Sequence, residues 1–479
     1  MFDIIVIGGG PTGVTAALRA RELGASVALV ERDRMGGTCT NDGCVPTRVL
    51  AHTARLIRDA AQFETYGLIG PQPQLDFARL MQQTRHIVET IHDKKELVEH
   101  LQQAGVTFYH SDARFTGQHT IALSDGTELE GDKFIIAVGG HARRLPFPGS
   151  EHALTHSDVW EMQALPRSVA IVGAAATGCQ LASVFHDFGA QVTLLEVMPR
   201  ILSGEDEHVS ATMTEALNRR GIQIVTGMGG IETIEKHGSD LRVTYTLDDE
   251  QKTLTAEAVI LAVGWPGSIE ALNLEAASVE AEKSYVKVND SLRTTAPHIF
   301  AAGDITGRMM LVQSGSYEAR VAAENAVLGT SRDYEHRIVP HGGFTEPEYG
   351  SVGLTEQQAR EAHDVTVAVV PYAHLDRAVI DGRTEGFCKL VVDRDSHLIL
   401  GAHVVGEQAV EVVQMIAAGM AAIMRIEQLA ELELAYPTFT AIVGLAARQL
   451  ARELGVIPLA REWSNLRQLN VAEWERSGH

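Results

Sequence analysis

Cys39 and Cys44 are the residues of this 479-residue chain whose type and spacing most directly indicate chemistry. They lie in the segment GGTCTNDGCVPTR, at residues 36–48. The chain has four cysteines in all, which is typical of a protein from a reducing compartment, where a close pair is more often catalytic or metal-binding than structural. We therefore expect a cytoplasmic protein, and of the two roles for the pair we favour redox chemistry.

The backbone between the two cysteines must be irregular if they are to form a disulfide. On a regular helix, residues five apart differ by about 7.5 Å in axial rise and point to different sides. Bridged cysteines need Cα atoms within about 7 Å of each other. Gly43 permits the necessary distortion, and Pro46 then favours a regular helix over residues 47–61. A bridge held in this way would be strained and easily reduced, which favours a catalytic role.

Two other interpretations of the pair are weaker. A zinc site needs about four ligands, and the remaining cysteines, Cys179 and Cys388, lie far along the chain without ligand-like neighbours. We expect these two to be small core residues, and we predict no metal site. Two unrelated buried thiols at Cys39 and Cys44 remain an alternative.

The composition limits the class of protein and its partners. Hydrophobic residues make up 45% and charged residues 21%, which is typical of a globular chain, and the length favours about three domains. The net charge of −22 argues against nucleic acid and against an anionic membrane surface as partners. No basic region precedes the apolar run that begins at Ile4, so we expect no signal peptide. The longest apolar stretch, near residues 415–424, is too short to span a bilayer.

An internal repeat predicts the architecture that holds the cysteines. Residues 6–31, VIGGGPTGVTAALRARELGASVALVE, align without a gap with residues 171–196, IVGAAATGCQLASVFHDFGAQVTLLE. Each copy has a buried strand, a glycine turn, a helix, a glycine stop and a second strand, and this order predicts a βαβ unit.

Both copies carry the pattern of a dinucleotide-binding turn. In the first copy, the glycines of GGGPTG follow a strand and open a helix, and Glu31 stands where a carboxylate would accept hydrogen bonds from ribose hydroxyls. In the second copy, Ala175 replaces the middle glycine, and Glu196 would repel a 2′-phosphate, which favours NAD(H) over NADP(H). Two dinucleotide sites in one chain indicate electron transfer from a nicotinamide to a flavin.

The segment HIFAAGDITG, at residues 298–307, adds a strand that ends in Gly303 and Asp304. An aspartate at this place can hold a ribityl or pyrophosphate group, or it can simply form the turn. On this segment alone, both interpretations stay open.

The ordered motifs resemble a known family over nearly the whole chain. GGGPTG, GGTCTNDGCVPT, FIIAVGG (134–140), the second βαβ unit, AAGDITG and FTEPEYGSVGLTEQQAR (344–360) occur in the order found in the two-cysteine pyridine nucleotide–disulfide oxidoreductases. That family includes dihydrolipoamide dehydrogenase, glutathione reductase and mercuric reductase. The resemblance implies an α/β protein with two Rossmann-like domains, for FAD and NAD(P), and a C-terminal α+β dimerisation domain. It places the first part of the FAD domain at 1–145, the NAD(P) domain at 146–265, the second, central part of the FAD domain at 266–337 and the dimerisation domain at 338–479.

The same resemblance assigns expected roles to individual residues. The enzyme would be a homodimer in which the C-terminal domain of one subunit completes the disulfide site of the other. Cys44 would face the flavin and form a thiolate–flavin charge-transfer pair, while Cys39 would attack the substrate, so that electrons run from NAD(P)H through FAD to the disulfide. The residues expected to bind FAD are Gly8, Gly10, Pro11, Thr12, Gly13, Glu31, Gly37, Thr38, Gly139, Gly303 and Asp304. The residues expected to bind NAD(P) are Gly173, Gly178, Gln180, Glu196 and Gly264.

The proton acceptor of the family is missing from this sequence. The disulfide reductases carry a His-Pro pair near the C-terminus, followed by a glutamate, whereas this chain has Tyr436 and Ala441 at those positions. A phenol titrates near pH 10 and an imidazole near 6.5, so Tyr436 is a poor base at neutral pH. The loss of a general base typically costs about 10²–10⁴-fold in rate. Another of the 20 histidines could serve instead.

Two further departures change the charge near the cysteines. The family's lysine after the disulfide motif is Arg48 here, and its glutamate partner on the second βαβ helix is Gln180. An uncompensated Arg48 would favour a thiolate and an anionic reduced flavin, unless it simply faces solvent. Asp42 lies between the cysteines, and its charge should oppose a nearby thiolate.

These departures define the predicted function. Mercuric reductases resemble this chain in having an aromatic-Pro pair at the histidine position, and a soft metal ion bound by thiolates needs no base. They also end in a vicinal cysteine pair, whereas this chain ends in NVAEWERSGH. We therefore expect an FAD-dependent NAD(P)H oxidoreductase that passes electrons through Cys39 and Cys44 to a small-molecule acceptor, which is a soft metal ion, a quinone or an unusual small disulfide. A divergent dihydrolipoamide dehydrogenase and a non-turnover redox or nucleotide sensor are the alternatives.

Overall fold

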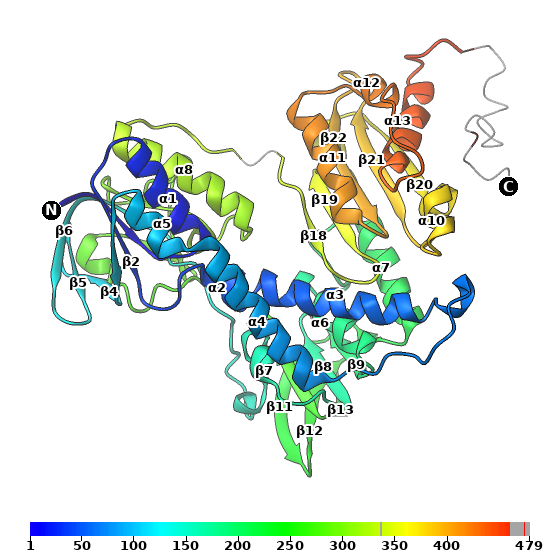
Figure 1. Ribbon diagram of the computed structural model, residues 1–479, viewed down its shortest axis with the longest axis horizontal. Coiled ribbons are helices and arrows are strands. Elements are labelled where there is room, and N and C mark those ends of the chain that lie inside the picture. Colours follow the sequence, from blue (N-terminus) through cyan, green and yellow to red (C-terminus); the bar gives the residue numbers. More distant parts are fainter. Residues whose placement is uncertain (336–337, 460–473, 475–479) are drawn as a thin grey trace. The chain divides into compact units, whose positions relative to one another are not determined.

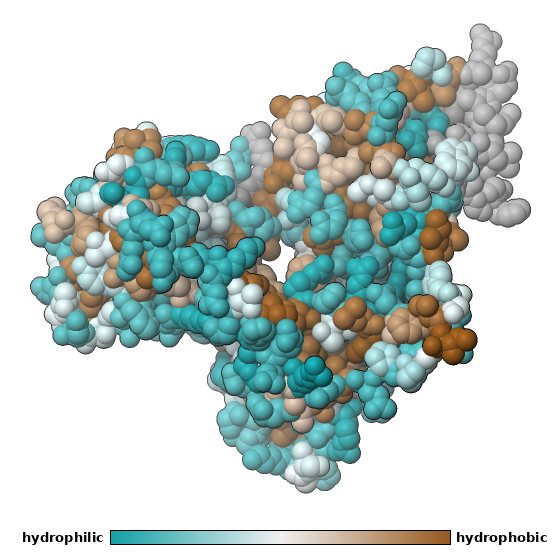
Figure 2. Space-filling view, viewed as in Figure 1, coloured by the Kyte–Doolittle hydropathy of each residue, from teal (hydrophilic) through white to brown (hydrophobic). Residues whose placement is uncertain are grey.

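The structure is a computed structural model that describes residues 1–335, 338–459 and 474. The chain divides into two units, and each is built from separate stretches of sequence (Figure 1). Unit 1 comprises Met1–Pro146, Leu154–Leu165 and Val263–His336, and unit 2 comprises Phe147–Ala153, Pro166–Ala262 and Arg337–His479. Figure 2 shows one face of the molecule, on which hydrophilic residues predominate, in keeping with the net charge of −22.

Unit 1 is built around a mixed sheet that is covered by helices. Its strands are β1 (Phe2–Ile7), β2 (Val27–Glu31), β3 (Val106–His110), β4 (Ala113–Phe115), β5 (Thr120–Leu123), β6 (Glu128–Ile136), β7 (Leu154–Thr155), β15 (Ala281–Glu282), β16 (Tyr285–Val286) and β17 (Ile299–Ala301). Its helices are α1 (Pro11–Glu22), α2 (Gly37–Asn41), α3 (Cys44–Ala60), α4 (Phe77–Lys95), α5 (Leu97–Gln103) and α8 (Val312–Leu328). The main sheet has the order β3-β2-β1-β6-β5-β4, and β17 also pairs with β6.

The centre of this sheet is parallel and buried on both faces. β1 pairs in parallel with β2 on one side and with β6 on the other. The last four residues of β1, IIVI, are all buried, as expected for a strand covered on both faces. α1 and α8 pack side by side against the sheet (Figure 1). Their contact brings the glycine turn before α1 close to the segment that precedes α8.

The described residues of unit 2 form three sheets. The first is parallel, with β8 (Ser168–Val172), β9 (Gln191–Leu195), β10 (Gln223–Val225) and β14 (Ala258–Leu261). The second is antiparallel, with β11 (Gly230–His237), β12 (Asp240–Leu247) and β13 (Glu250–Ala256). The third is antiparallel, with β18 (His341–Gly343), β19 (Tyr349–Gly353), β20 (Val365–Pro371), β21 (Phe387–Asp393) and β22 (Ile399–Val405). The helices are α6 (Ala176–Asp187), α7 (Glu207–Arg220), α9 (Glu356–Ala362), α10 (Asp376–Ile380), α11 (Ala409–Ala421), α12 (Ile426–Ala430) and α13 (Ala441–Glu453).

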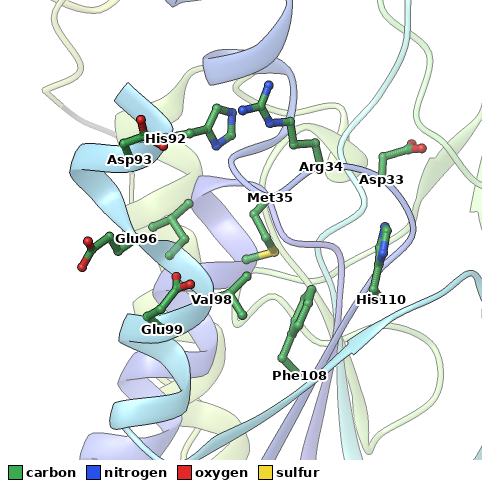
Figure 3. Close-up of a pocket in the computed structure, with 11 residues that line it drawn as sticks. Asp33, Arg34, Met35, His92, Asp93, Glu96, Val98, Glu99, Phe108 and His110 are labelled. Carbon is green, nitrogen blue, oxygen red and sulfur yellow. The ribbon is translucent and has the colours of Figure 1, made fainter. Parts of the chain in front are cut away.

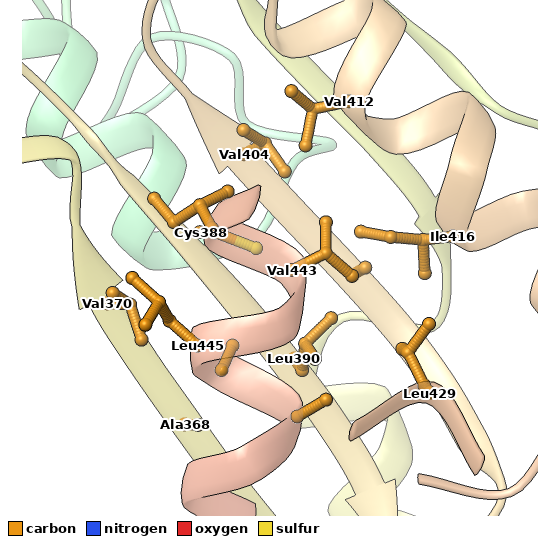
Figure 4. Packing of buried hydrophobic residues seen from close by; sticks show 14 of the residues in the cluster. Ala368, Val370, Cys388, Leu390, Val404, Val412, Ile416, Leu429, Val443 and Leu445 are labelled. Carbon is orange, nitrogen blue, oxygen red and sulfur yellow. The ribbon is translucent and has the colours of Figure 1, made fainter. Parts of the chain in front are cut away.

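The third sheet packs against α11 and α13 through a hydrophobic core (Figure 4). Val443 on α13 and Ile416 on α11 are fully buried in this core, together with Leu390 and Val404 from the sheet. Cys388 belongs to the same core, and Cys179 on α6 is also fully buried. The prediction that these two cysteines are small core residues is therefore confirmed. Among the described residues, no helix is both long and apolar enough to cross a membrane.

The predicted repeat is present as two matching βαβ units. In the first, the Gly8 N–H donates to the Val30 carbonyl at 2.8 Å, and in the second the Gly173 N–H donates to the Leu195 carbonyl at 2.7 Å. A Cβ atom on Gly13 would lie 1.8 Å from the Gly8 carbonyl oxygen, so only glycine lets the helix approach the turn this closely. The corresponding distance from a Cβ atom on Gly178 to the Gly173 oxygen is also 1.8 Å.

The helix after the cysteines starts earlier than predicted. It was expected over residues 47–61, whereas α3 spans Cys44–Ala60. Pro46 is therefore the third residue of the helix. Because the first four N–H groups of a helix have no intrahelical partner, a proline is tolerated there.

Candidate active site

The two glycine turns hold their acidic residues in the same way. In unit 1, the Glu31 carboxylate accepts hydrogen bonds from the backbone N–H groups of Gly9, at 2.5 Å, and Asp33, at 2.7 Å. In unit 2, the Glu196 carboxylate accepts hydrogen bonds from the N–H groups of Ala174, at 2.6 Å, and Met198, at 2.8 Å. Ala175, which replaces the middle glycine, precedes α6 just as Gly10 precedes α1. Both turns therefore present a fixed carboxylate beside the start of a helix.

The cysteine segment docks directly onto the first glycine turn. The Gly36 N–H donates to the Gly9 carbonyl at 2.9 Å. Gly37 has φ +55°, and a Cβ atom there would lie 2.9 Å from Gly10 Cα. A side chain at position 37 would thus push the two loops apart. This contact fixes α2, and with it Cys39, next to the predicted dinucleotide turn.

Most of the residues predicted to bind FAD converge in unit 1. A Cβ atom on Gly8 would meet the Ala137 carbonyl oxygen at 2.3 Å, next to the segment that carries Gly139. One on Gly303 would meet Thr12 Oγ1 at 2.6 Å. The glycine turn therefore lies against the segments that follow both β6 and β17. A small pocket opens beside it, and its lining includes Ile7, Gly8, Glu31, Ser111, Val138 and Leu272.

The surroundings of this turn fit a polar dinucleotide. Ser314, near the start of α8, is buried, and its hydroxyl has no hydrogen-bond partner. Its neighbour Gly315 packs so closely that a Cβ atom there would lie 2.4 Å from Thr12 Oγ1. At Gly10, by contrast, an added Cβ atom would meet only Gly37 Cα, at 3.8 Å, which leaves room for a ligand group. The unsatisfied hydroxyl and the open turn suit the polar backbone of FAD.

The two cysteines lie on either side of a break between helices. Cys39 is in α2, which ends at Asn41, and Cys44 is the first residue of α3. Cys39 is half-buried and Cys44 is exposed. Their thiols are joined by a hydrogen bond, so the sulfur atoms are neighbours in spite of the sequence spacing.

This contact separates the acidities of the two thiols. The hydrogen bond from Cys39 lowers the pKa of Cys44 to about 7, with burial opposing and the backbone N–H of Cys44 assisting. The position at the start of a 17-residue helix favours the same thiolate. The pKa of Cys39 is raised by its bond to Cys44, then by burial and by Asp304, while the Lys95 ammonium opposes the rise. Cys44 is therefore the thiolate of the reduced pair, and Cys39 holds the proton.

Asp304, rather than Asp42, is the carboxylate that acts on the thiols. Burial raises the pKa of Asp304 to about 6, with the Trp265 indole counteracting in part. Asp304 raises the pKa of both cysteines. Asp42, which was expected to oppose the thiolate, instead accepts a hydrogen bond from Ser157 Oγ at 2.7 Å.

Arg48 and Gln180 lie in different units. Arg48 is on α3 in unit 1, and Gln180 is on α6 in unit 2. The Gln180 side chain accepts a hydrogen bond from the Phe344 N–H at 3.1 Å and donates one to the Ala176 carbonyl at 3.0 Å. Gly264, the remaining predicted NAD(P) residue, belongs to unit 1, where its carbonyl accepts the Arg143 N–H at 3.1 Å.

Tyr436 lies in unit 2, in the segment between α12 and α13. The residue is 53% exposed. Its hydroxyl donates a hydrogen bond to the Asp376 carboxylate at 2.6 Å. Ala441, at the position where the family has its glutamate, is the first residue of α13. The phenol at the expected proton-acceptor position is therefore engaged as a donor.

Sequence reasoning missed Lys95, Trp265 and His156. Lys95 ends α4, Trp265 flanks Asp304, and the His156 ring lies 5.0 Å from the Trp265 ring. None belongs to a motif, and each reaches the site through chain segments distant in sequence. A preference for charged residues at a helix C-terminus could have suggested Lys95. It could not have indicated the contact with the cysteine segment.

A family assignment follows from comparison with known proteins. The family model described as pyridine nucleotide-disulphide oxidoreductase matches residues 2–319. The model for the dimerisation domain of the same family matches residues 339–447. The chain belongs to the pyridine nucleotide-disulphide oxidoreductase family. The predicted family, fold class and enzyme class are confirmed, and the family supports FAD as the cofactor.

Particular relatives differ in their activities. The dihydrolipoyl dehydrogenase of Bacillus subtilis is 32% identical over 440 residues, which cover 88% of this chain and 92% of the relative. The mercuric reductase of Bacillus cereus is 32% identical over 416 residues, which cover 86% of this chain and 66% of the relative. Among solved structures, the HOCl-induced flavoprotein disulfide reductase RclA of Escherichia coli has a TM-score of 0.83 and 26% identity, covering 93% of this chain and 99% of that chain. RclA is also known as a Cu(II) complex.

The low pKa of Cys44 gives a direct test of the site. In the reduced protein, alkylation of Cys44 by iodoacetamide should follow a pH midpoint near 7, well below the ordinary thiol value of 9.0, because only the thiolate reacts. The rate should fall as the pH drops below this midpoint. In Cys39→Ala, which lacks the hydrogen-bond donor, the midpoint should move to higher pH. Peptide mass spectrometry of samples quenched at intervals measures the rate, and a wild-type midpoint near 9 would contradict the assignment.

Proposed function

We propose that the chain is an NADH-oxidising flavoprotein that uses Cys39 and Cys44 to reduce a thiophilic metal ion, with Cu(II) as the substrate. The observation that carries this proposal is the engagement of Tyr436 as a hydrogen-bond donor at the family's proton-acceptor position. A small disulfide must be protonated as it leaves, whereas a metal ion that binds to thiolates needs no such help. The mercuric reductase relatives and the Cu(II) complex of RclA support an acceptor of this class.

The reaction balances with the residues present. FAD, when bound, supplies two-electron transfer from the nicotinamide to the cysteine disulfide. The dithiol form of Cys39 and Cys44 then loses two electrons and two protons as its sulfur–sulfur bond forms. Each Cu(II) accepts one electron, so one NADH reduces two Cu(II) to two Cu(I). The pKa of Cys44 is about 7, so its thiol is partly ionised at neutral pH, whereas Cys39 has to release its proton.

Glu196 supports NADH over NADPH as the electron donor. Its carboxylate is buried, and each of its oxygens accepts a backbone N–H group. A ribose with two free hydroxyls can hydrogen-bond to such a carboxylate, whereas a 2′-phosphate would be repelled by it. We propose that Gly173, Gly178 and Gln180 bind this nucleotide together with Glu196.

The assembly we propose is a homodimer. The match of residues 339–447 to the dimerisation domain supports it. In this proposal the domains keep the limits expected from the sequence, and the residues around Tyr436 face the thiols of the other subunit. A divergent dihydrolipoamide dehydrogenase is the second candidate, because the Bacillus subtilis enzyme matches 88% of the chain.

An anaerobic acceptor panel tests the proposal. The holoprotein is reduced with NADH and mixed with Cu(II), lipoamide or glutathione disulfide, and Cu(I) is measured with a colorimetric chelator. We expect two Cu(I) per NADH, and at least about 10²-fold slower turnover of either disulfide, as expected without a general base. NADPH should support a lower rate than NADH. Fast lipoamide turnover would favour the dehydrogenase, and a flavin that NADH fails to bleach would favour a sensor.

A further inference from the structure

The short helix that carries Cys39 is held by the last turn of α4. α2 has five residues, too few to be stable alone. The Lys95 ammonium donates a hydrogen bond to Thr40 Oγ1 at 3.1 Å, and Thr40 is fully buried. One turn earlier, His92 Nε2 donates to Asn41 Oδ1 at 2.7 Å. Two neighbouring residues of α2, directly after Cys39, are thus tied to the same end of α4.

The loop before α2 completes this arrangement. Asn41 Nδ2 donates a hydrogen bond to the Gly37 carbonyl at 3.0 Å, which links the last residue of α2 to its first. Arg34 forms an ion pair with Glu89 on α4. Figure 3 shows His92 and Arg34 close together above Met35, at the edge of a pocket of about 590 Å³. α4 therefore contacts both the loop before α2 and the last two residues of α2.

Lys95 acts on the two thiols unequally. Its ammonium opposes the rise in the pKa of Cys39 that Cys44, burial and Asp304 cause. The causes that shift the pKa of Cys44 are its bond to Cys39, burial, its own N–H and Asp304. Near the end of α4, Arg34, Glu89 and Asp93 act together with Lys95 on the His92 imidazole. Cys44 and Asp304 act together with Lys95 on the Cys39 thiol. The Lys95 ammonium therefore favours ionisation of Cys39, the cysteine that holds the proton.

We propose that Lys95 is a positioning residue for Cys39. It holds the neighbouring Thr40 by a hydrogen bond, and it places a positive charge closer to Cys39 than to Cys44. This inference rests on the proposed function, in which Cys39 loses its proton when the pair delivers electrons. Tyr436, whose hydroxyl donates to Asp376, is not the acceptor of that proton. A fixed ammonium stabilises the thiolate that remains, without itself taking part in proton transfer.

The test isolates Cys39 in the holoprotein that carries Cys44→Ser. In this background the rate of Cys39 alkylation by iodoacetamide is measured between pH 6 and 10. Adding Lys95→Met should lower the rate at pH 7 by about three- to tenfold, since a nearby cation favours the thiolate. The difference in alkylation rate between the variants with and without Lys95→Met should become smaller in 0.5 M salt, because Lys95 is exposed and salt screens its charge. Lys95→Arg should retain the parent profile.

Lys94→Met is the matched control. Lys94 is the exposed neighbour of Lys95 on the same helix. Its replacement by methionine should leave the rate of Cys39 alkylation within about twofold of the parent at each pH. Flavin content and circular dichroism verify that every variant is folded. An unchanged profile in Lys95→Met, or an equal change in Lys94→Met, would overturn the inference. Because alkylation requires no acceptor, the result is separate from that of the acceptor panel.

Discussion

Replacing Cys39 with serine should leave flavin reduction by NADH intact and remove almost all reduction of Cu(II). The two functions separate because Cys44 remains at the start of α3, whereas no second sulfur remains to close a disulfide. Serine cannot form a disulfide with Cys44, so the path by which two electrons pass from the flavin to Cu(II) is lost. We expect the Cu(II) rate to fall by at least about 10³-fold, the size of loss typical when a reacting side chain is removed.

Stopped-flow spectroscopy under anaerobic conditions measures both halves of this experiment. Flavin bleaching after mixing with NADH should occur within about threefold of the wild-type rate, because Cys39 does not bind the nucleotide in the proposed scheme. Cys388→Ala is the matched control, since Cys388 is a fully buried core residue in unit 2. It should retain Cu(II) reduction. Undiminished Cu(II) reduction by Cys39→Ser would mean that electrons leave from the flavin itself, and the thiol relay would be wrong.

The sequence predicted the parts of the site that local geometry determines. The repeat around Gly13 and Gly178 could be found because a close approach between strand and helix admits only glycine, and this requirement leaves a fixed spacing. The break between Cys39 and Cys44 could be expected because a regular helix keeps residues five apart from meeting. Both features depend on residues that lie near each other in the chain.

The electrostatics of the site could not be predicted in the same way. Asp42 was expected to act on the thiols because it lies between them in sequence, yet its carboxylate binds Ser157. Asp304 and Lys95 act instead, one from the turn after β17 and one from the end of α4. The three-dimensional arrangement of separate elements decides which charge is near, and spacing along the chain carries no information about it. The extent of α3 was missed for a different reason, since a proline in the first turn does not mark where a helix begins.

Tyr436→His should raise the slow disulfide turnover that we expect of the wild type. An imidazole with a pKa near 6.5 is a neutral proton acceptor at pH 7.5, whereas a phenol is not. We expect lipoamide turnover to rise by about 10²-fold, the lower end of the range for a general base. The gain should be present above about pH 6.5 and lost below it, as the imidazole becomes protonated. The rate of Cu(II) reduction should stay within about twofold, because that acceptor requires no base.

The structure offers a carboxylate that can orient this imidazole. Ala441 cannot do so, but the Asp376 carboxylate already accepts a hydrogen bond from the side chain at position 436, at 2.6 Å. Because an imidazole is shorter than a phenol, the Asp376 side chain has to move toward it to accept one ring N–H. The other nitrogen then stays the proton acceptor, which is the usual way a histidine base is held. Asp376→Asn in the Tyr436→His background should therefore remove much of the gain. Tyr436→Phe is the control for loss of the phenol hydroxyl, and it should show no gain in lipoamide turnover. If Tyr436→His also shows none, the proton acceptor is another residue, and the engagement of Tyr436 no longer argues for a metal ion over a disulfide.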